Sequence, residues 1–415
     1  MNYIDQFEEA LHQEDQAGLE AVMKQVEQET NPEEQVLFAQ YLESIGYFSL
    51  AKRIYQILAP EYPEFYINLA SIAGEDDQAE EAFGYLEQIP PTSDLYAAAL
   101  VGKAELYQLE GLTDLAREKL AQAQTLTDDS LVVFGLAELD FELGAYEQAI
   151  KEYAQLDNRM IFQQTGVSTY QRIGLCYASL GRLELATEFL EKALELEYDD
   201  ATLLEVAAIL YEQEEYQKAN TYFKQLDTMS PDYEGYEYLY AQSLHAEHRV
   251  EEALQIAKQG LSKNPFQTKL LLLASQFSYE MHQPEEAEQF LLQAMEDAED
   301  LDEIVLRLTN LYLETERYEE ILPFAQMEVD NVLARWNIAR AFQQLEDDDK
   351  ALDLYRELEN DLKDNPEFLE SYLQLLRQMG QNEKAKEIAG TYLKLVPDDL
   401  AVQDYLSDLE ARQEY

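Results

Sequence analysis

The chain has 415 residues and is strongly acidic, with 85 Asp and Glu against 29 Lys and Arg and a net charge of −56. This length exceeds one ordinary hydrophobic core, so we expect several domains or one repeat array. The negative field repels phosphate backbones and anionic lipid surfaces, which argues against nucleic-acid and membrane binding. It favours a basic partner, although such a charge also serves solubility alone.

Apolar residues occur only in short groups. Leu270 to Ala274 is among the longest runs, far below the roughly 20 residues of a membrane helix. The N-terminus lacks the basic start and the apolar stretch of a secretory signal. We therefore expect a cytoplasmic protein without membrane insertion. The single cysteine, Cys176, excludes an internal disulfide and is expected to be a small core residue.

A repeated pattern runs along almost the whole chain. A small residue in an acidic or polar context recurs with spacings near 34, at Ala51, Ala82, Ala116, Ala149, Ala186, Ala219, Ala253, Ala287, Ile321, Ala351 and Ala385. Twelve residues before each of these lies a second, mostly small series: Ala39, Ala70, Ala104, Ala137, Gly174, Ala207, Ala241, Ser275, Thr309, Ala339 and Leu373. We call the series that begins with Ala51 the second-helix series, and the series that begins with Ala39 the first-helix series. Small residues allow two helices to approach closely.

Glycine and proline divide each repeat further. Five residues before the second-helix series lie glycines that suit a tight turn: Gly46, Gly111, Gly144, Gly181 and Gly380. Twelve residues after it lie prolines that end a helix: Pro63, Pro231, Pro265 and Pro397. Each repeat is thus predicted as helix, tight turn, helix and loop.

In chain order, residues 1–32 are predicted as a capping helix pair, with apolar residues at helical spacing. Residues 33–165 hold repeats 1 to 4, residues 166–300 repeats 5 to 8, and residues 301–399 repeats 9 to 11. Residues 400–415 form a polar-backed capping helix, because a repeat array must shield its terminal apolar faces.

Two places interrupt the period. Three additional residues lie around Asp157 to Thr169, and the ninth repeat has Ile321 in place of alanine and Pro323 inside its second helix. Either could bend the array. Each of the two segments, near 157–169 and near 321–331, could be a hinge or a partner site. The alternative is that the repeat has diverged there without a functional role.

The repeat that begins at Tyr170 shows the repeated pattern most completely. Its matching residues are Tyr170, Ile173, Gly174, Tyr177, Gly181, Ala186, Leu190 and Ala193. This resembles the tetratricopeptide repeat (TPR) family, although Tyr198 stands where the family usually has proline. The resemblance covers roughly residues 33 to 398. In length, acidity and lack of other motifs the chain also resembles the YpiA-type cytosolic TPR proteins of Gram-positive bacteria.

The resemblance implies an all-α, right-handed superhelical solenoid of about eleven helix-turn-helix repeats, with capping helices at both ends. In this family the first helices line the concave groove, at positions 3 before, 1 after and 4 after the first-helix series. The expected groove residues are Phe134, Phe141, Tyr211, Tyr238, Gln242, His245, Gln276, Tyr279, Asn310, Trp336, Arg340 and Gln374.

These positions combine aromatic pockets with a ladder of amides, formed by Gln242, Gln276, Asn310 and Gln374. An amide offers both a donor and an acceptor to the backbone of an extended peptide. The alternative is that the apolar residues complete helix packing and the amides only keep the wall polar. Basic residues are rare there, so an apolar or basic segment fits better than an acidic one.

No pattern for catalysis or for a cofactor is present. Neither of the common glycine-rich phosphate loops occurs, and no catalytic pair can be assigned among 85 acidic residues. Three histidines, His245, His248 and His282, could hold a metal, but exposed turn histidines are the commoner interpretation. Acidic pairs in the loops could bind calcium, but helix capping is the simpler interpretation.

We therefore expect a non-catalytic adaptor or scaffold that binds a protein or peptide. The alternative is a peptide-sensing regulatory receptor of the bacterial TPR type. Residues 1–32 are too short and too acidic for the DNA-binding domain that such receptors usually carry.

Overall fold

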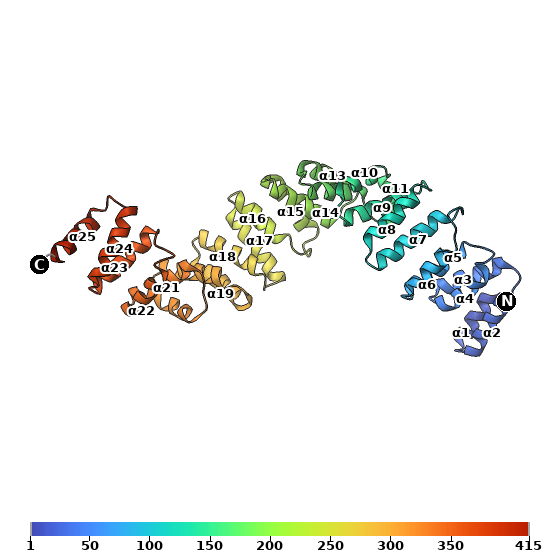
Figure 1. Ribbon diagram of the computed structural model, residues 1–415, viewed down its shortest axis with the longest axis horizontal. Helices are drawn as coiled ribbons and strands as arrows, with labels where there is room; N and C mark the ends of the chain where they lie inside the picture. The colour runs from blue at the N-terminus through green and yellow to red at the C-terminus, as the bar shows by residue number, and fades with distance from the viewer. Residues whose placement is uncertain (1, 414–415) are drawn as a thin grey trace. The chain divides into compact units, whose positions relative to one another are not determined.

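The computed structural model describes the backbone of residues 2–413 and the side chains of residues 2–409. Within this part the chain forms 25 α-helices, one 3-10 helix and no strand (Figure 1). The predicted all-α fold class is confirmed. The chain divides into two compact units, Met1–Ile209 (unit 1) and Leu210–Tyr415 (unit 2).

Unit 1 contains α1 (Tyr3–His12), α2 (Gln16–Glu27), α3 (Pro32–Ser44), α4 (Phe48–Leu58), α5 (Phe65–Glu75), α6 (Ala79–Leu86), α7 (Tyr96–Leu109), α8 (Thr113–Gln124), α9 (Ser130–Glu142), α10 (Tyr146–Tyr153), α11 (Asn158–Thr165), α12 (Thr169–Ser179) and α13 (Leu183–Leu196). The boundary between the units falls within α14 (Asp200–Glu212). Unit 2 contains α15 (Tyr216–Met229), α16 (Glu237–Ala246), α17 (Val250–Lys263), α18 (Thr268–Glu280), α19 (Pro284–Asp297), α20 (Asp302–Glu314), η1 (Tyr318–Gln326), α21 (Val332–Gln344), α22 (Asp348–Leu358), α23 (Pro366–Gln378), α24 (Asn382–Leu395) and α25 (Leu400–Gln413).

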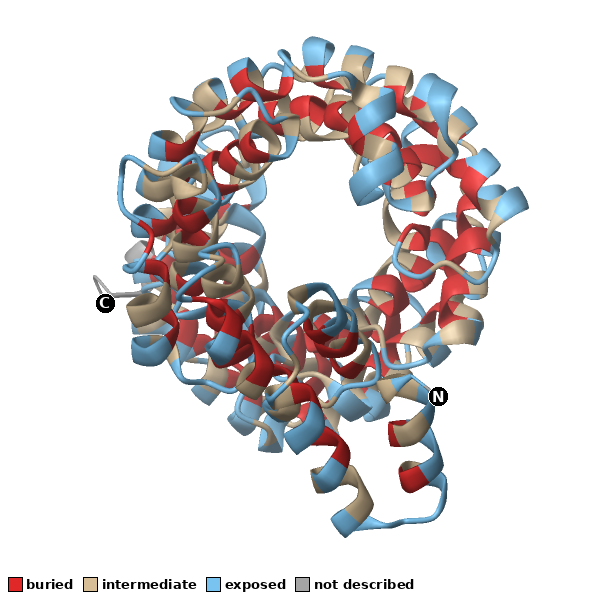
Figure 2. Cartoon of the chain, turned by 90° about the vertical axis from the view of Figure 1, so that its right-hand side faces the viewer, coloured by how far each residue is buried: buried red, intermediate tan, exposed pale blue. Residues whose placement is uncertain are grey.

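Most helices form pairs in which three residues separate the first helix from the second. The predicted small residues lie where the helices meet. Every residue of the second-helix series and of the first-helix series is buried. Figure 2 shows buried residues where neighbouring helices face one another, with exposed residues in the turns and loops. The spacing in the sequence is therefore explained by close packing between helices.

The turn inside each pair has one consistent backbone conformation. Its middle residue has a positive φ in every pair, and the five predicted glycines hold this position, as at Gly46 with φ 79°. Six pairs from α5 onward use a residue with a side chain instead: Asp77, Glu214, His248, His282, Glu316 and Glu346. These residues adopt the left-handed conformation that normally favours glycine. His248 and His282 are thus turn residues, as the more common interpretation predicted.

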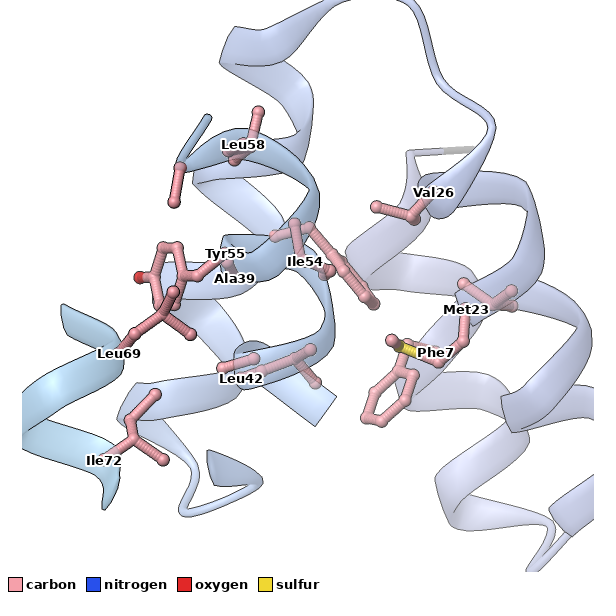
Figure 3. Packing of buried hydrophobic residues seen from close by; sticks show 14 residues of the cluster. Phe7, Met23, Val26, Ala39, Leu42, Ile54, Tyr55, Leu58, Leu69 and Ile72 are labelled. Carbon is pink, nitrogen blue, oxygen red and sulfur yellow. The ribbon is translucent and has the colours of Figure 1, made fainter. Parts of the chain in front are cut away.

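The first and last helices bury apolar residues, and their role as caps stays a prediction. In α1 and α2, Phe7 and Met23 are fully buried and pack with residues of the next pair, such as Leu42 and Ile54 (Figure 3). At the other end, Val402 of α25 is buried, while the polar residues around it are exposed. Glu410, which we also expected on the polar face, lies outside the described side chains.

Both predicted irregularities correspond to unusual elements. The second helix of the pair that begins with α9 is α10, which has only eight residues, and an additional helix of eight residues, α11, follows it. In the pair that begins with α20 the second helix is η1, a 3-10 helix of nine residues that contains Pro323. Proline lacks the N–H for an α-helical bond and clashes with the carbonyl four residues earlier. Whether either segment acts as a hinge stays a prediction.

The capping interpretation of the acidic pairs is correct at some loops and wrong at others. Asp129 accepts a hydrogen bond from the backbone N–H of Leu131, and Asp399 accepts bonds from Ala401 and Val402. These carboxylates satisfy free amides at the start of α9 and α25.

Two other acidic groups do not cap a helix. Asp76 and Asp77 lie in the turn that follows α5, and Asp77 holds the left-handed position. Asp347 precedes α22 but makes no capping bond, and its carboxylate pairs with Lys350 at 2.7 Å. Both exceptions occur in the short turn within a pair, where the left-handed residue fixes the chain direction.

Candidate functional site

The first helices of unit 2 carry most of the predicted groove residues, and one pocket brings three of them together. The pocket has a volume of about 300 Å³ and lies between α18, α19 and α20. Gln276, Tyr279 and Asn310 line it. Ala287 and Leu291 of the second helix are almost completely buried beneath them and provide an apolar floor. An apolar floor with a polar rim is the usual composition of a ligand pocket.

The rim of this pocket is preorganised by hydrogen bonds between successive repeats. The Tyr279 hydroxyl donates to Glu314 Oε2 at 2.5 Å, and this bond raises the pKa of Tyr279. Arg307 of α20 donates to the Leu272 carbonyl of α18 at 2.9 Å and to Glu303 of its own helix at 2.5 Å. These bonds hold the aromatic ring and the guanidinium in defined positions.

The amides of the predicted ladder already have partners within the chain. Gln276 donates from Nε2 to Glu280 Oε1 at 2.9 Å, and Gln242 donates to the Tyr238 hydroxyl at 3.3 Å. The Asn310 side-chain oxygen accepts a bond from Asn337 at 2.7 Å. A peptide backbone would therefore compete with existing bonds at these three positions.

Gln374 differs from the other ladder residues. It is exposed on α23, and no hydrogen bond within the described residues involves its side chain. Of the four ladder amides it is the most open to a ligand.

The remaining residues of the predicted groove in α14 and α16 contact one another and α18. The Tyr211 hydroxyl donates to Gln242 Oε1 at 3.5 Å. His245 stacks on Phe277, with ring centroids 4.8 Å apart, and its Nε2 lies 2.8 Å from Glu280 Oε2. His245 is therefore tied to a single carboxylate. Within the described residues no group of three His, Cys, Asp or Glu side chains could hold a metal ion.

Trp336 and Arg340 lie farther along unit 2. Trp336 is buried, with 7% exposure, and packs edge-to-face on Phe368 with centroids 5.9 Å apart. The Arg340 guanidinium lies over the indole at 5.4 Å and is exposed. The indole therefore contributes to packing between helices, and the guanidinium is the part that faces solvent.

In unit 1 the two predicted phenylalanines are half-buried and engaged within the chain. Phe134 lies 6.2 Å from the Tyr153 ring, and Arg172 lies 5.3 Å over the Phe141 ring. The same Arg172 pairs with both oxygens of Glu138 at 2.9 Å. This part of the face is occupied by its own aromatic and ionic contacts.

Cys176 is fully buried in α12, and burial raises the pKa of its thiol to about 12. The thiolate, which is the reactive form, is therefore disfavoured at neutral pH. This agrees with its prediction as a core residue. Among the described residues, no helix is long and apolar enough to cross a membrane.

Sequence reasoning missed two groups of residues, one in each unit. Arg307 and Glu314 shape the pocket of unit 2, but they fall outside the three groove positions that the family pattern supplied. Glu105 of unit 1 does occupy a groove position, yet nothing in its local sequence sets it apart from the many other glutamates. Its surroundings include residues of α5 and α9, which are distant along the chain, and appear only in the fold.

Four segments of the chain match tetratricopeptide-repeat family models. Residues 167–200 and 210–277 match general tetratricopeptide repeats, residues 108–160 match the YpiA-like repeats, and residues 333–399 match the YpiA-like C-terminal repeats. Together with the helix pairs and their three-residue turns, these matches identify the chain as a tetratricopeptide-repeat protein. Its YpiA-like segments lie in both units.

The chain is similar over nearly its whole length to TPR repeat-containing protein YpiA of Bacillus subtilis (strain 168). The two are 26% identical over 394 residues, which is 92% of each chain. The resemblance to YpiA-type proteins that the sequence suggested is thereby confirmed.

Two solved structures share helical repeats with this chain at low identity. Naa15/Naa10 bound to HypK-THB gives a TM-score of 0.41 at 14% identity, covering 92% of this chain and 66% of that chain, so this chain spans just under two thirds of its length. The APC/C hetero-tetramer Cut9–Hcn1 gives a TM-score of 0.35 at 15% identity, covering 99% and 89%. Both scores are too low to carry an argument about function.

Proposed function

We propose that this protein is a non-catalytic adaptor that binds a segment of a client protein on the first-helix face of unit 2. The observation that carries the proposal is the pocket between α18, α19 and α20, where an apolar floor is surrounded by Gln276, Tyr279 and Asn310. Such a pocket can bury one side chain of the client, while the polar rim fixes the orientation of the segment.

The chemistry of the client follows from the charge of the whole chain. With 85 acidic and 29 basic residues, the surface attracts a basic segment and repels an acidic one. The apolar floor favours an apolar side chain beside the basic ones. A client segment that combines both is therefore expected, and nucleic acid is not.

A peptide-sensing regulatory receptor is the second candidate. It would depend on an amide ladder that is open to a peptide backbone. Gln242, Gln276 and Asn310 already hydrogen bond within the chain, so part of the hydrogen-bonding capacity of each amide is used before a peptide binds. The adaptor, which depends on the pocket, is the better supported of the two.

The test is affinity capture from a cytosolic extract with the full chain and two variants. One variant changes the pocket, Gln276→Ala with Tyr279→Ala and Asn310→Ala. The other is a control on the exposed side of α19, Glu285→Ala with Gln289→Ala. Cross-linking followed by mass spectrometry locates the contact on the chain. We expect a client that cross-links to α18 or α20 and is lost only with the pocket variant.

Equal recovery of all captured proteins by the three forms, with unchanged helicity, would exclude the pocket as the binding site. Cross-links confined to second helices or loops would contradict the proposal in the same way.

A further inference from the structure

The first helices of unit 1 form a second hollow face, over α5, α7 and α9. Two pockets lie side by side on it, with volumes of about 630 Å³ and about 300 Å³. They share Ile67, Gly102 and Glu105, so they form one continuous surface, which we call the Glu105 groove. It lies within unit 1 and is separate from the pocket of the proposed function.

The Glu105 groove is mainly apolar apart from its carboxylates. Ile67, Val101, Leu109 and Leu131 supply apolar side chains along its length. A Cβ at Gly102 would lie 3.3 Å from a Leu86 methyl group, a tight packing contact. This close packing against Leu86 accounts for the glycine without a ligand.

The charges in the groove all have one sign. Its lining includes Glu75, Asp94, Glu105 and Asp129, and no Lys or Arg among the described residues lines either pocket. One oxygen of Asp129 is used to cap α9. By contrast, within the described residues no hydrogen bond or ion pair involves Glu105, although both pockets meet at it.

Glu105 is a carboxylate in an environment that does not favour its charge. Its side chain reaches solvent at the mouth of the groove, but the neighbouring first helices remove part of its hydration. This desolvation raises the pKa of Glu105 above its usual value. A cation placed beside it would recover the lost electrostatic stabilisation.

We propose that the Glu105 groove binds a peptide segment of a partner protein through one lysine or arginine side chain, which contacts the Glu105 carboxylate, with apolar residues beside it. The long aliphatic part of such a side chain suits the apolar lining, and its charged end suits the carboxylate. The apolar surface on either side, spread over three helices, is the reason for choosing a peptide. A small polyamine would satisfy Glu105 and leave that surface uncovered.

The test begins with selection of a random twelve-residue peptide library, displayed on phage, against the full chain. Enriched peptides are synthesised, and their affinities are measured by fluorescence polarisation. We expect a Lys or Arg flanked by apolar residues in the enriched sequences. Glu105→Gln should weaken these peptides by about tenfold, as expected for loss of a charge-assisted bond. Glu110→Gln, an exposed acid at the end of α7, is the matched control and should leave the affinity unchanged.

Several outcomes would overturn the proposal. They are failure to enrich any peptide, enrichment of peptides without a basic residue, and equal affinity for wild type and Glu105→Gln. Competition by spermidine at the peptide's own affinity would identify a polyamine site instead. Peptides that are lost with Tyr279→Ala and not with Glu105→Gln bind in unit 2, which supports the proposed function and contradicts the Glu105 groove. Melting curves of each variant confirm that the fold is retained.

Discussion

Asp140 shows at the level of single residues how unit 1 tolerates a buried charge. Its side chain is fully buried in α9, and Arg117 of α8 donates from Nε to Oδ1 and from Nη2 to Oδ2, the latter at 3.2 Å. Removing the guanidinium leaves the carboxylate buried without a counter-ion. Because Arg117 is itself partly exposed, we expect Arg117→Ala to cost about 2 kcal/mol, less than for a fully buried pair.

Urea unfolding of Arg117→Ala checks this value. The double variant Arg117→Met with Asp140→Leu is the control, because replacing both charges by apolar groups removes the penalty and should restore most of the stability. A single variant as stable as wild type would mean that water reaches Asp140.

The left-handed turn residues give a second prediction at this scale. Glu346 has φ 60° and is exposed, whereas Gly111 holds the equivalent turn position with φ 70°. Glu346→Gly should stabilise the chain by roughly 0.5–1 kcal/mol, because glycine adopts this conformation without steric cost. Gly111→Ala should destabilise it by a similar amount. Opposite signs in the midpoints of urea unfolding are the expected result, and equal signs would show that turn conformation does not decide stability here.

Glu105 predicts a dependence on pH. Partial desolvation raises the pKa of Glu105 in the folded chain. The folded state is therefore more stable, relative to the unfolded state, when Glu105 is protonated. That contribution is complete below the unfolded pKa of about 4.3 and is lost as the pH rises through the folded pKa. Glu105→Gln, which is always neutral, should therefore melt higher than wild type at pH 7, and the difference should shrink towards pH 4. Glu110→Gln, at an exposed position at the end of α7, is the control for removal of a charge. A constant difference across this range would exclude the raised pKa.

At the level of elements, one side chain joins the additional helix α11 to the helix that follows it. Asn158 Oδ1 accepts hydrogen bonds from Thr169 N at 2.7 Å and from Ser168 Oγ at 3.1 Å, which join the start of α11 to the start of α12. The same oxygen also accepts from Thr169 Oγ1 and Tyr170 N, so Asn158→Ala removes four bonds and leaves polar groups without their partner. We expect a loss of about 1–2 kcal/mol.

Hydrogen exchange distinguishes a local effect from a global one. Amides of residues 158–169 should exchange faster in Asn158→Ala, with little change in α7 and α8. Asn158→Asp, which keeps the accepting oxygen, should retain most of the protection. Faster exchange throughout unit 1 would instead mean that α11 supports the whole unit.

The sequence predicted the helix pairs because their packing repeats the same local requirement. A small residue such as Ala186 must lie where two helices meet, and a residue such as Gly181 must permit the left-handed turn. These residue types therefore recur in the sequence with the period of the repeat. The two irregular segments were also located, because extra residues and Pro323 interrupt that period. The additional helix α11 and the 3-10 helix η1, which stands in place of a second α-helix, were not predicted.

The partners of the site residues could not be predicted in the same way. His245 contacts Glu280, and Tyr279 contacts Glu314, each 35 residues farther along the chain. Such contacts depend on how one repeat stacks on the next, and the local sequence does not define this. For the same reason Glu105 could not be distinguished from its neighbours. The positions of the groove residues were accessible from the pattern, whereas their hydrogen bonds were not.

For the whole molecule, the excess of acid is the dominant electrostatic property. Even if every one of the 29 basic residues paired with an acid, 56 of the 85 acidic residues would keep no counterpart (85 − 29 = 56). Their mutual repulsion opposes the compact state. Raising NaCl from about 0.02 M to about 0.5 M shortens the Debye length from roughly 20 Å to roughly 4 Å. We therefore expect salt to raise the melting temperature by about 5 °C or more.

Screening and specific cation binding give different results in this experiment. NaCl, KCl and choline chloride at equal ionic strength should stabilise the chain equally if screening is the cause, because only ionic strength then matters. A melting temperature that falls with salt would show instead that the ion pairs between repeats, such as Arg317 with Glu288 at 2.5 Å, outweigh the repulsion among the unpaired acids. The same salt series, applied to peptide binding, should weaken a basic segment on either face, since that attraction depends on the unscreened negative charge.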